Sequence, residues 1–191
     1  MDRYILNYDG TLTNNGELIS LNDGVADNLI HVPHLAPHVI QIAMPRGENI
    51  KIKIIYSSHC WSEEYKQEEH ILKKPSILVF DNAKRRIFNK DRFEKSKILP
   101  EFLAQLPSHK LYLTPSDRNY GVYNASKIVD DCVYTAFFTL KKNKGRLNRI
   151  RHSLLMRVES AYVIPQPSKG MKTKISVAID KALKGEKLKY R

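Results

Sequence analysis

The sequence predicts an α+β domain: a mainly antiparallel curved sheet with one or two helices, preceded by an irregular N-terminal extension. Segments in which apolar and polar residues alternate recur from residue 39 onward, as in Lys51-Ile52-Lys53-Ile54. One stretch, between residues 89 and 106, carries apolar residues at helical spacing. The 191 residues, 42% hydrophobic and 27% charged, suit a single globular domain and exclude a disordered or coiled-coil chain.

Residues 1–38 are predicted to form the irregular extension, because the segment His31–His38 holds two prolines that interrupt any regular helix. Residues 39–191 are predicted to form the single α+β domain, of which residues 141–191 are its strongly basic part. Two strand pairs are expected first, namely Val39–Met44 with Lys51–Tyr56 and Ile77–Phe80 with Arg86–Phe88.

A helix is predicted that either Asn89 or Asp91 can cap and that ends before Pro107, with a kink or division at Pro100. The remaining chain is expected to form mostly strands. They are Lys110–Thr114, Cys132–Leu140, the long strand Ile150–Val163 after a basic turn at Lys141–Arg146, and Lys174–Ala178, followed by a short helix at Ile179–Lys184.

The sequence indicates a cytoplasmic protein without a membrane-spanning helix. No apolar run approaches the roughly 20 residues that such a helix needs. The first seven residues do not resemble a signal peptide. The two cysteines, Cys60 and Cys132, are too few for a disulfide framework.

The net charge of +12 is concentrated in the last quarter of the chain. Residues 141–191 hold 15 of the 32 basic residues but only three acidic ones, whereas residues 1–140 are neutral overall. Solubility needs a net charge of only roughly 2–8, so this excess predicts an anionic partner: nucleic acid first, with an acidic protein such as an antitoxin or host factor as the alternative. The candidate phosphate-binding residues are Lys141, Lys142, Lys144, Arg146, Arg149, Arg151, Lys172 and Lys174.

The histidines and cysteines do not predict a metal site. A structural zinc site needs four ligands at close spacings. The pair His59-Cys60 is adjacent rather than spaced, and Cys132 lies far away in the sequence. We therefore expect no metal and no cofactor.

Tyrosines near basic residues suggest stacking on the bases of single-stranded nucleic acid, although most of them are expected to be core or rim residues. They are Tyr112, Tyr120, Tyr123, Tyr134, Tyr162 and Tyr190.

His59 and the strand around Arg157 are the candidate catalytic elements. His59 follows an alternating strand and is a natural general acid or base near neutral pH. On Ile150–Val163, strict alternation places Arg157 on one face and Ser160 and Tyr162 on the other. The structural alternative is a hydrogen-bonded His59 beside a buried Trp61.

The segments Met156–Tyr162, Thr173–Ile179 and Leu183–Lys187, with His59 upstream, carry a family resemblance. They resemble small phage- and plasmid-borne proteins that are themselves similar to the barnase–EndoU–colicin–RelE superfamily of metal-independent ribonucleases. The resemblance covers residues 39–188 at the level of pattern. It implies a catalytic set of His59, Arg157, Ser160 and Tyr162, with the substrate's own 2′-hydroxyl as the nucleophile.

These observations favour a nucleic-acid-binding protein of mobile-element type, directed at RNA rather than DNA. If it is an enzyme, we expect a metal-independent endoribonuclease toxin. The alternative is a non-catalytic phage- or plasmid-encoded inhibitor or host-interaction protein that acts through its basic surface.

Overall fold

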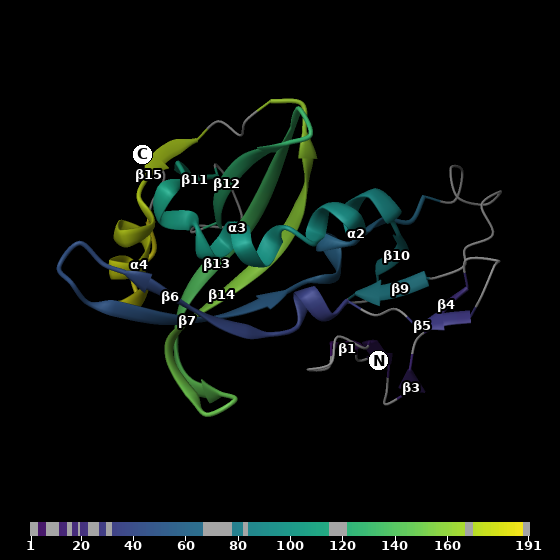
Figure 1. Cartoon of the computed structure of the whole chain (residues 1–191), viewed down its shortest axis with the longest axis horizontal. Coiled ribbons are helices and arrows are strands. Elements are labelled where there is room, and N and C mark those ends of the chain that lie inside the picture. Colours follow the sequence, from purple (N-terminus) through teal and green to yellow (C-terminus); the bar gives the residue numbers. More distant parts are fainter. Residues whose placement is uncertain are drawn as a thin grey trace.

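The structure is a computed structural model. It describes residues 32–66, 78–81, 84–114, 122–166 and 170–188, together with short strands near the N-terminus. Those short strands form two small antiparallel sheets (Figure 1). They are β1 (Tyr4–Leu6), β2 (Leu12–Asn14), β3 (Glu17–Leu18), β4 (Ser20–Asn22) and β5 (Asp27–Leu29).

A seven-stranded sheet forms the body of the protein, in the order β15-β11-β12-β13-β14-β7-β6. Neighbouring strands are antiparallel except for β14 and β7, which are parallel. The predicted α+β class with a mainly antiparallel, curved sheet is therefore confirmed. The strands are β6 (His38–Ala43), β7 (Asn49–Tyr56), β11 (Leu111–Leu113), β12 (Val122–Val129), β13 (Cys132–Leu147), β14 (Ile150–Ile164) and β15 (Met171–Thr173).

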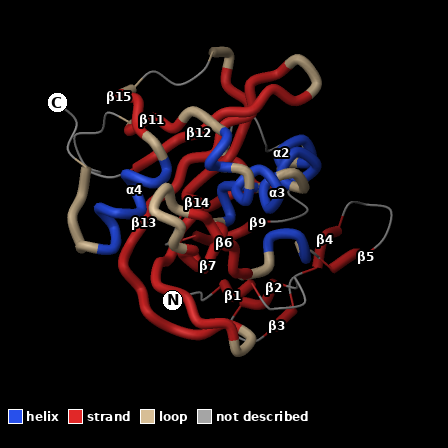
Figure 2. Tube along the Cα trace, turned by 60° about the vertical axis from the view of Figure 1, so that its left-hand side comes forward, coloured by secondary structure: helices blue, strands red, loops and turns tan. Residues whose placement is uncertain are grey.

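Strands β13 and β14 form a hairpin much longer than the sequence predicts. The prediction of a basic turn at Lys141–Arg146 is wrong, because these residues continue β13 in extended conformation. The chain reverses instead at Asn148 and Arg149, whose φ angles of 47° and 67° suit the tight turn that matches strand twist. Beyond the body the hairpin bends away from the sheet (Figures 1 and 2). We call its residues 141–151 the arm.

The helices lie in two places. Asn89 caps α2 (Lys90–Ser96) by accepting a 2.9 Å hydrogen bond from the Arg92 N–H, and α3 (Leu99–Ala104) restarts the helical path with Pro100 in its first turn. The predicted cap and division at Pro100 are confirmed. The predicted strand Lys174–Ala178 is wrong, because α4 (Ile175–Leu183) begins there. Its buried residues Ile175, Ala178, Ile179 and Ala182 recur at helical spacing.

A third small sheet joins β8 (Ser62–Glu64), β10 (Lys84–Phe88) and β9 (Leu78–Asp81), which confirms the predicted second strand pair. Short 3₁₀ turns occur at η1 (Pro33–Leu35), η2 (Ser58–Cys60) and η3 (Leu106–Ser108). Val32 and Leu35 are fully buried, so the segment 32–38 packs into the core although the sequence analysis placed it in the extension.

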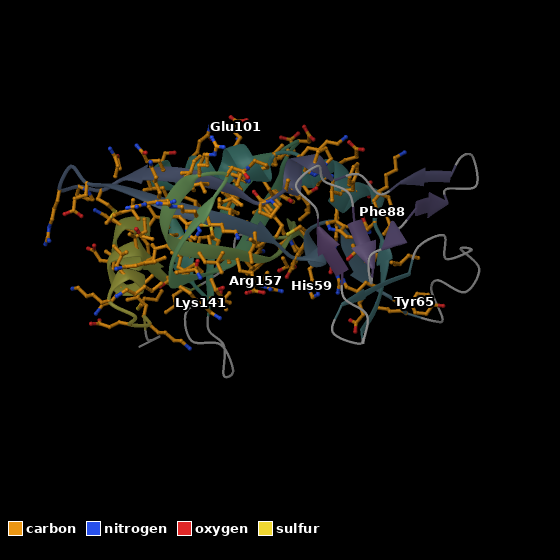
Figure 3. The ribbon with its side chains drawn as sticks, turned by 90° about the horizontal axis from the view of Figure 1, so that it is seen from below. His59, Tyr65, Phe88, Glu101, Lys141 and Arg157 are labelled. Carbon is orange, nitrogen blue, oxygen red and sulfur yellow. The ribbon has the colours of Figure 1, made fainter. Side chains whose placement is uncertain are left out.

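The core lies between the helices and one face of the large sheet. Ile52, Ile54, Met156 and Phe138 point into it, packed with α3 and α4. The opposite face, which we call the open face, carries the alternate residues of the same strands. Glu101 of α3 lies on one side of the molecule, whereas Lys141, Arg157 and His59 lie on the other (Figure 3). None of the helices in the described part of the chain is long and apolar enough to cross a membrane.

Candidate nucleic-acid interface

A β-bulge in β14 brings the late-strand candidates onto one face. Phe137 of β13 pairs with Ser160, but the next residue, Phe138, pairs with Val158, so Glu159 has no partner on β13. The extra residue reverses the alternation. Arg157 therefore shares the open face with Ser160 and Tyr162. The predicted placement of Arg157 on the opposite face was wrong, because strict alternation does not allow for a bulge.

The carboxylate of the bulge residue Glu159 binds two side chains of the site. Its Oε2 accepts a 3.0 Å hydrogen bond from Arg157 Nε, and its Oε1 accepts one of 3.1 Å from Thr139 Oγ1. Both side chains of the ion pair are partly exposed, which limits its strength to that of a surface pair. The guanidinium of Arg157 is thus oriented by a carboxylate that the sequence analysis did not include.

Ser57 fixes the backbone of the bulge. It follows β7 and donates its N–H to the Val158 carbonyl at 3.0 Å and its hydroxyl to the Glu159 carbonyl at 2.5 Å. The first bond continues the parallel pairing of β7 with β14, whose last pair is Tyr56 with Val158, and the second gives the next carbonyl a side-chain donor. The turn η2 and helix α2 pack on β14 beyond that point.

A pocket of about 390 Å³ opens beside the bulge on the open face. Phe137 and Tyr162 form an aromatic wall, with ring centroids 5.5 Å apart and planes inclined by 22°. Polar atoms come from Thr139, Glu159 and Ser160. The lining is completed by Thr114 and Val122, at the end of β11 and the start of β12.

Arg92 of α2 joins this site from the strand edge. Its guanidinium carbon lies 5.1 Å from the centroid of the Tyr162 ring, within cation–π range. The same guanidinium donates to the carbonyl of Ser62 at 2.9 Å and to that of His59 at 3.4 Å. Arg92 therefore links η2 to the aromatic wall of the pocket.

His59 lies on the 3₁₀ turn η2 rather than at the end of a strand. The turn starts at Ser57, whose Oγ accepts from the His59 N–H at 3.2 Å. His59 is half-buried and does not line the pocket, but it is connected to it through Arg92. The adjacent Cys60 is fully buried, and burial raises the pKa of its thiol to about 12, so this group is no nucleophile at neutral pH. Trp61 is buried, as the structural alternative predicts.

The arm gathers six of the predicted phosphate-binding residues, all exposed and without an acidic residue among them. None of the six forms an ion pair within the described part of the chain. Arg146 and Arg151 are direct cross-strand partners, and like charges at such positions destabilise a sheet unless an anion lies between them. The six are Lys141, Lys142, Lys144, Arg146, Arg149 and Arg151.

Lys172 and Lys174 lie elsewhere, so the structure does not bring the whole predicted set together. Lys172 is on β15, at the far edge of the sheet, and Lys174 precedes α4. Together with Lys110 they line a second pocket, of about 480 Å³.

The tyrosines predicted to stack on bases are not all on one surface either. Tyr123 and Tyr134 are buried in the core, where no base can reach them. Tyr112 and Tyr162 are partly exposed on the open face. Tyr120 and Tyr190 lie outside the described residues.

Four residues of the site were not predicted from the sequence, namely Arg92, Glu159, Thr139 and Phe137. Glu159 carries one available signal, since it is the single acidic residue in the long basic stretch between residues 141 and 179. Phe137 and Thr139 alternate along β13, but their pairing with β14 depends on the bulge. Arg92 is on a helix distant in sequence, and no local pattern indicates its contact with Tyr162.

His34 and His38, close to the predicted end of the N-terminal extension, contact residues distant in the sequence. His34 Nε2 lies 2.8 Å from Ser96 Oγ, and the His38 ring stacks on Tyr56. Within the described residues no group of three or more His, Cys, Asp or Glu side chains is arranged to hold a metal ion. His31 and His70 lie outside those residues.

A family model described as the YjaZ family matches residues 22–183, which is most of the chain. No curated protein and no solved structure matches this chain significantly.

Proposed function

This chain belongs to the YjaZ family, and we propose that it is a cytoplasmic nucleic-acid-binding protein of mobile-element type, directed at RNA. The arm and the open face of the sheet are the proposed interface. The observation that carries the proposal is the arm, in which six exposed cations lie on a projecting hairpin without an acidic neighbour. Such a cluster attracts phosphates by Coulomb forces and by counterion release.

Cleavage of the bound RNA is the catalytic extension of this proposal. The resemblance to metal-independent ribonucleases implies His59, Arg157, Ser160 and Tyr162 as the catalytic set. The last three share the open face at the bulge, whereas His59 lies on η2, where its backbone carbonyl accepts a hydrogen bond from Arg92. In this scheme a base removes the 2′-hydroxyl proton, the oxygen attacks the adjacent phosphorus, the 5′-oxygen leaves, and Arg157 stabilises the phosphorane.

Binding is tested by charge reversal in the arm. We expect Lys141→Glu, Lys142→Glu and Lys144→Glu together to weaken RNA binding and to flatten its salt dependence, by about 0.7 in the slope of log K against log salt for each lost contact with a single strand. Fluorescence anisotropy with labelled RNA at several salt concentrations measures both effects. The control combines Lys90→Glu and Lys95→Glu on α2 with Lys97→Glu directly after it, which makes the same charge change away from the arm. An unchanged slope in the arm variant would place the interface elsewhere.

Cleavage is tested by incubating the protein with RNA in the presence and absence of a chelator. The proposal predicts 2′,3′-cyclic phosphate ends that form in both conditions. His59→Ala is expected to lower the rate by roughly 10²–10⁴, the contribution of one general acid–base group. RNA that is bound but still intact after hours contradicts the catalytic part and leaves the binding part standing.

The second candidate function is a non-catalytic inhibitor or host-interaction protein with a basic surface. The ion pair between Arg157 and Glu159 favours it, because a carboxylate already occupies one donor of the proposed phosphate-stabilising group. Its partner would then be either RNA that is bound without reaction or an acidic protein.

A further inference from the structure

Cross-strand pairs on the open face form a continuous path from the arm to the pocket. On the open face, Arg146 pairs with Arg151, Lys141 pairs with Leu155, and Leu155 in turn pairs with Lys53 of β7. The next residue of β14 on this face is Arg157, which pairs with Thr139 at the rim of the pocket. Cations therefore occur in three of the four rows of this face from the arm to the pocket, over about 20 Å from Arg151 to Arg157.

The pocket at the end of this track is suited to a flat ligand. Its aromatic wall is formed by Phe137 and Tyr162, and its volume of about 390 Å³ has room for a base with its sugar. Stacking on aromatic side chains holds unpaired bases, whereas the bases of a duplex are already stacked and their faces are not accessible.

The polar atoms of the pocket call for a ligand that donates hydrogen bonds. Glu159 contributes two carboxylate oxygens, and each accepts one hydrogen bond, from Thr139 or Arg157, and has room for another. Asn124 lies in the row of Phe137 and Ser160, is fully buried and is not itself part of the pocket lining. It donates to Thr114 Oγ1 in the pocket lining at 2.8 Å, while its Oδ1 has no hydrogen-bond partner.

We propose that the open face binds single-stranded RNA, with its phosphates along the cation rows of β13 and β14 and one unstacked base in the pocket beside Glu159. Because Glu159 presents carboxylate acceptors to the pocket, the pocket selects a base whose exocyclic amino group offers two N–H donors over uracil, whose single N3–H lies between two carbonyl oxygens that a carboxylate repels. This inference rests on the proposed RNA binding and adds to it the strandedness of the RNA and a specificity-determining residue, Glu159.

The test measures anisotropy with labelled oligonucleotides of eight adenosines, eight cytidines or eight uridines, and with an RNA duplex of the same length. We expect the wild-type protein to bind the adenosine and cytidine strands about tenfold more tightly than the uridine strand, and more tightly than the duplex. Glu159→Gln is expected to bring the ratio close to one. Phe137→Leu is expected to weaken binding of all single strands while leaving the salt slope unchanged.

Glu101→Gln is the matched control, since it makes the same change on the opposite side of the molecule and is expected to behave as wild type (Figure 3). Binding that depends on salt and on the arm, but is equal for all bases and unchanged in both pocket variants, overturns this inference and leaves the proposed function intact. Preferential binding of the duplex also overturns it. If the wild-type protein binds none of the four probes, the proposed function fails, and this inference fails with it.

Discussion

Among single residues, Ser57 has the most specific structural role at the bulge. Its hydroxyl and N–H bind two successive carbonyls of β14, and its side chain is buried. We expect Ser57→Ala to lower the free energy of unfolding by about 1–2 kcal/mol, because the Glu159 carbonyl loses its donor in a site that water reaches poorly. Chemical denaturation measures this. The control is Ser153→Ala, at a partly exposed position of β14, which should change stability by less than about 0.5 kcal/mol.

The two cysteines are expected to differ in reactivity because only the thiolate reacts. Burial raises the pKa of the Cys60 thiol to about 12, whereas Cys132 is partly exposed at the start of β13. At pH 8 the native protein should therefore be alkylated at Cys132 alone, and the unfolded protein at both positions. Mass spectrometry after a short pulse of iodoacetamide distinguishes the sites. Labelling of Cys60 at a rate similar to that of Cys132 under native conditions would contradict its burial.

Among the strands and turns, the two tight reversals of the central hairpins set the register of the whole sheet. Asp130 and Asp131 join β12 to β13 with φ angles of 47° and 60°. This left-handed conformation costs a residue with a Cβ roughly 1–2 kcal/mol, part of which aspartate recovers through local hydrogen bonds.

Asp131→Gly is expected to raise the free energy of unfolding by about 0.5–1 kcal/mol, because glycine adopts this conformation without a steric penalty and is the preferred second residue of such turns. Asp131→Ala is the matched variant and should lower stability, since alanine keeps the Cβ but has no polar side chain to compensate. Thermal and chemical unfolding of both variants measure the difference. A lower stability for the glycine variant would indicate that the aspartate side chain makes a necessary contact.

The elements that local sequence determines were predicted well. Alternation identified β6 and β7, and Asn89 and Pro100 correctly marked the start of α2 and the division before α3. A cap or a proline acts on its own few residues, so its effect can be derived without knowledge of the rest of the fold.

The features that depend on strand pairing could not be predicted in the same way. β13 continues through Lys141–Arg146 only because β14 folds back along it, and the bulge at Glu159 follows from how the two strands register. β12 was missed because its partners, not its own composition, define it as a strand. The candidate site shows the same limit. Arg157, Ser160 and Tyr162 were selected from their order in the sequence, but their common face and their partner Glu159 come from tertiary structure.

At the scale of the whole molecule, the sheet separates two surfaces of different chemistry. One face packs on α3 and α4 and holds the core, while the other is open and continues into the arm. The proposed interface therefore lies on a rigid scaffold whose stability comes from the opposite face. Substitutions on the open face should change binding with little effect on folding, which makes the binding experiments interpretable.

Two histidines on the helical side of the sheet make the free energy of unfolding depend on pH. His34 of η1 contacts α2, with its ring against Phe93 and its Nε2 at Ser96 Oγ. Burial lowers the pKa of His34, and the charge of Lys97 lowers it further while that of Glu94 opposes the change. Burial also lowers the pKa of His109, which packs edge-to-face on Phe102. In both cases the folded state disfavours the protonated form.

A folded state that binds fewer protons than the unfolded chain loses stability as the pH falls. Since the ordinary pKa of histidine is about 6.5, the full contribution of His34 and His109 is present above that value and decreases below it. We expect the midpoint of urea denaturation to fall between pH 7.5 and pH 5.0, a range in which ordinary carboxylates remain ionised. The double variant His34→Gln, His109→Gln should show a smaller fall, because neither glutamine can bind a proton. If the variant loses as much stability as wild type over this range, the acid sensitivity originates in other groups, and the contact of η1 with α2 plays no part in it.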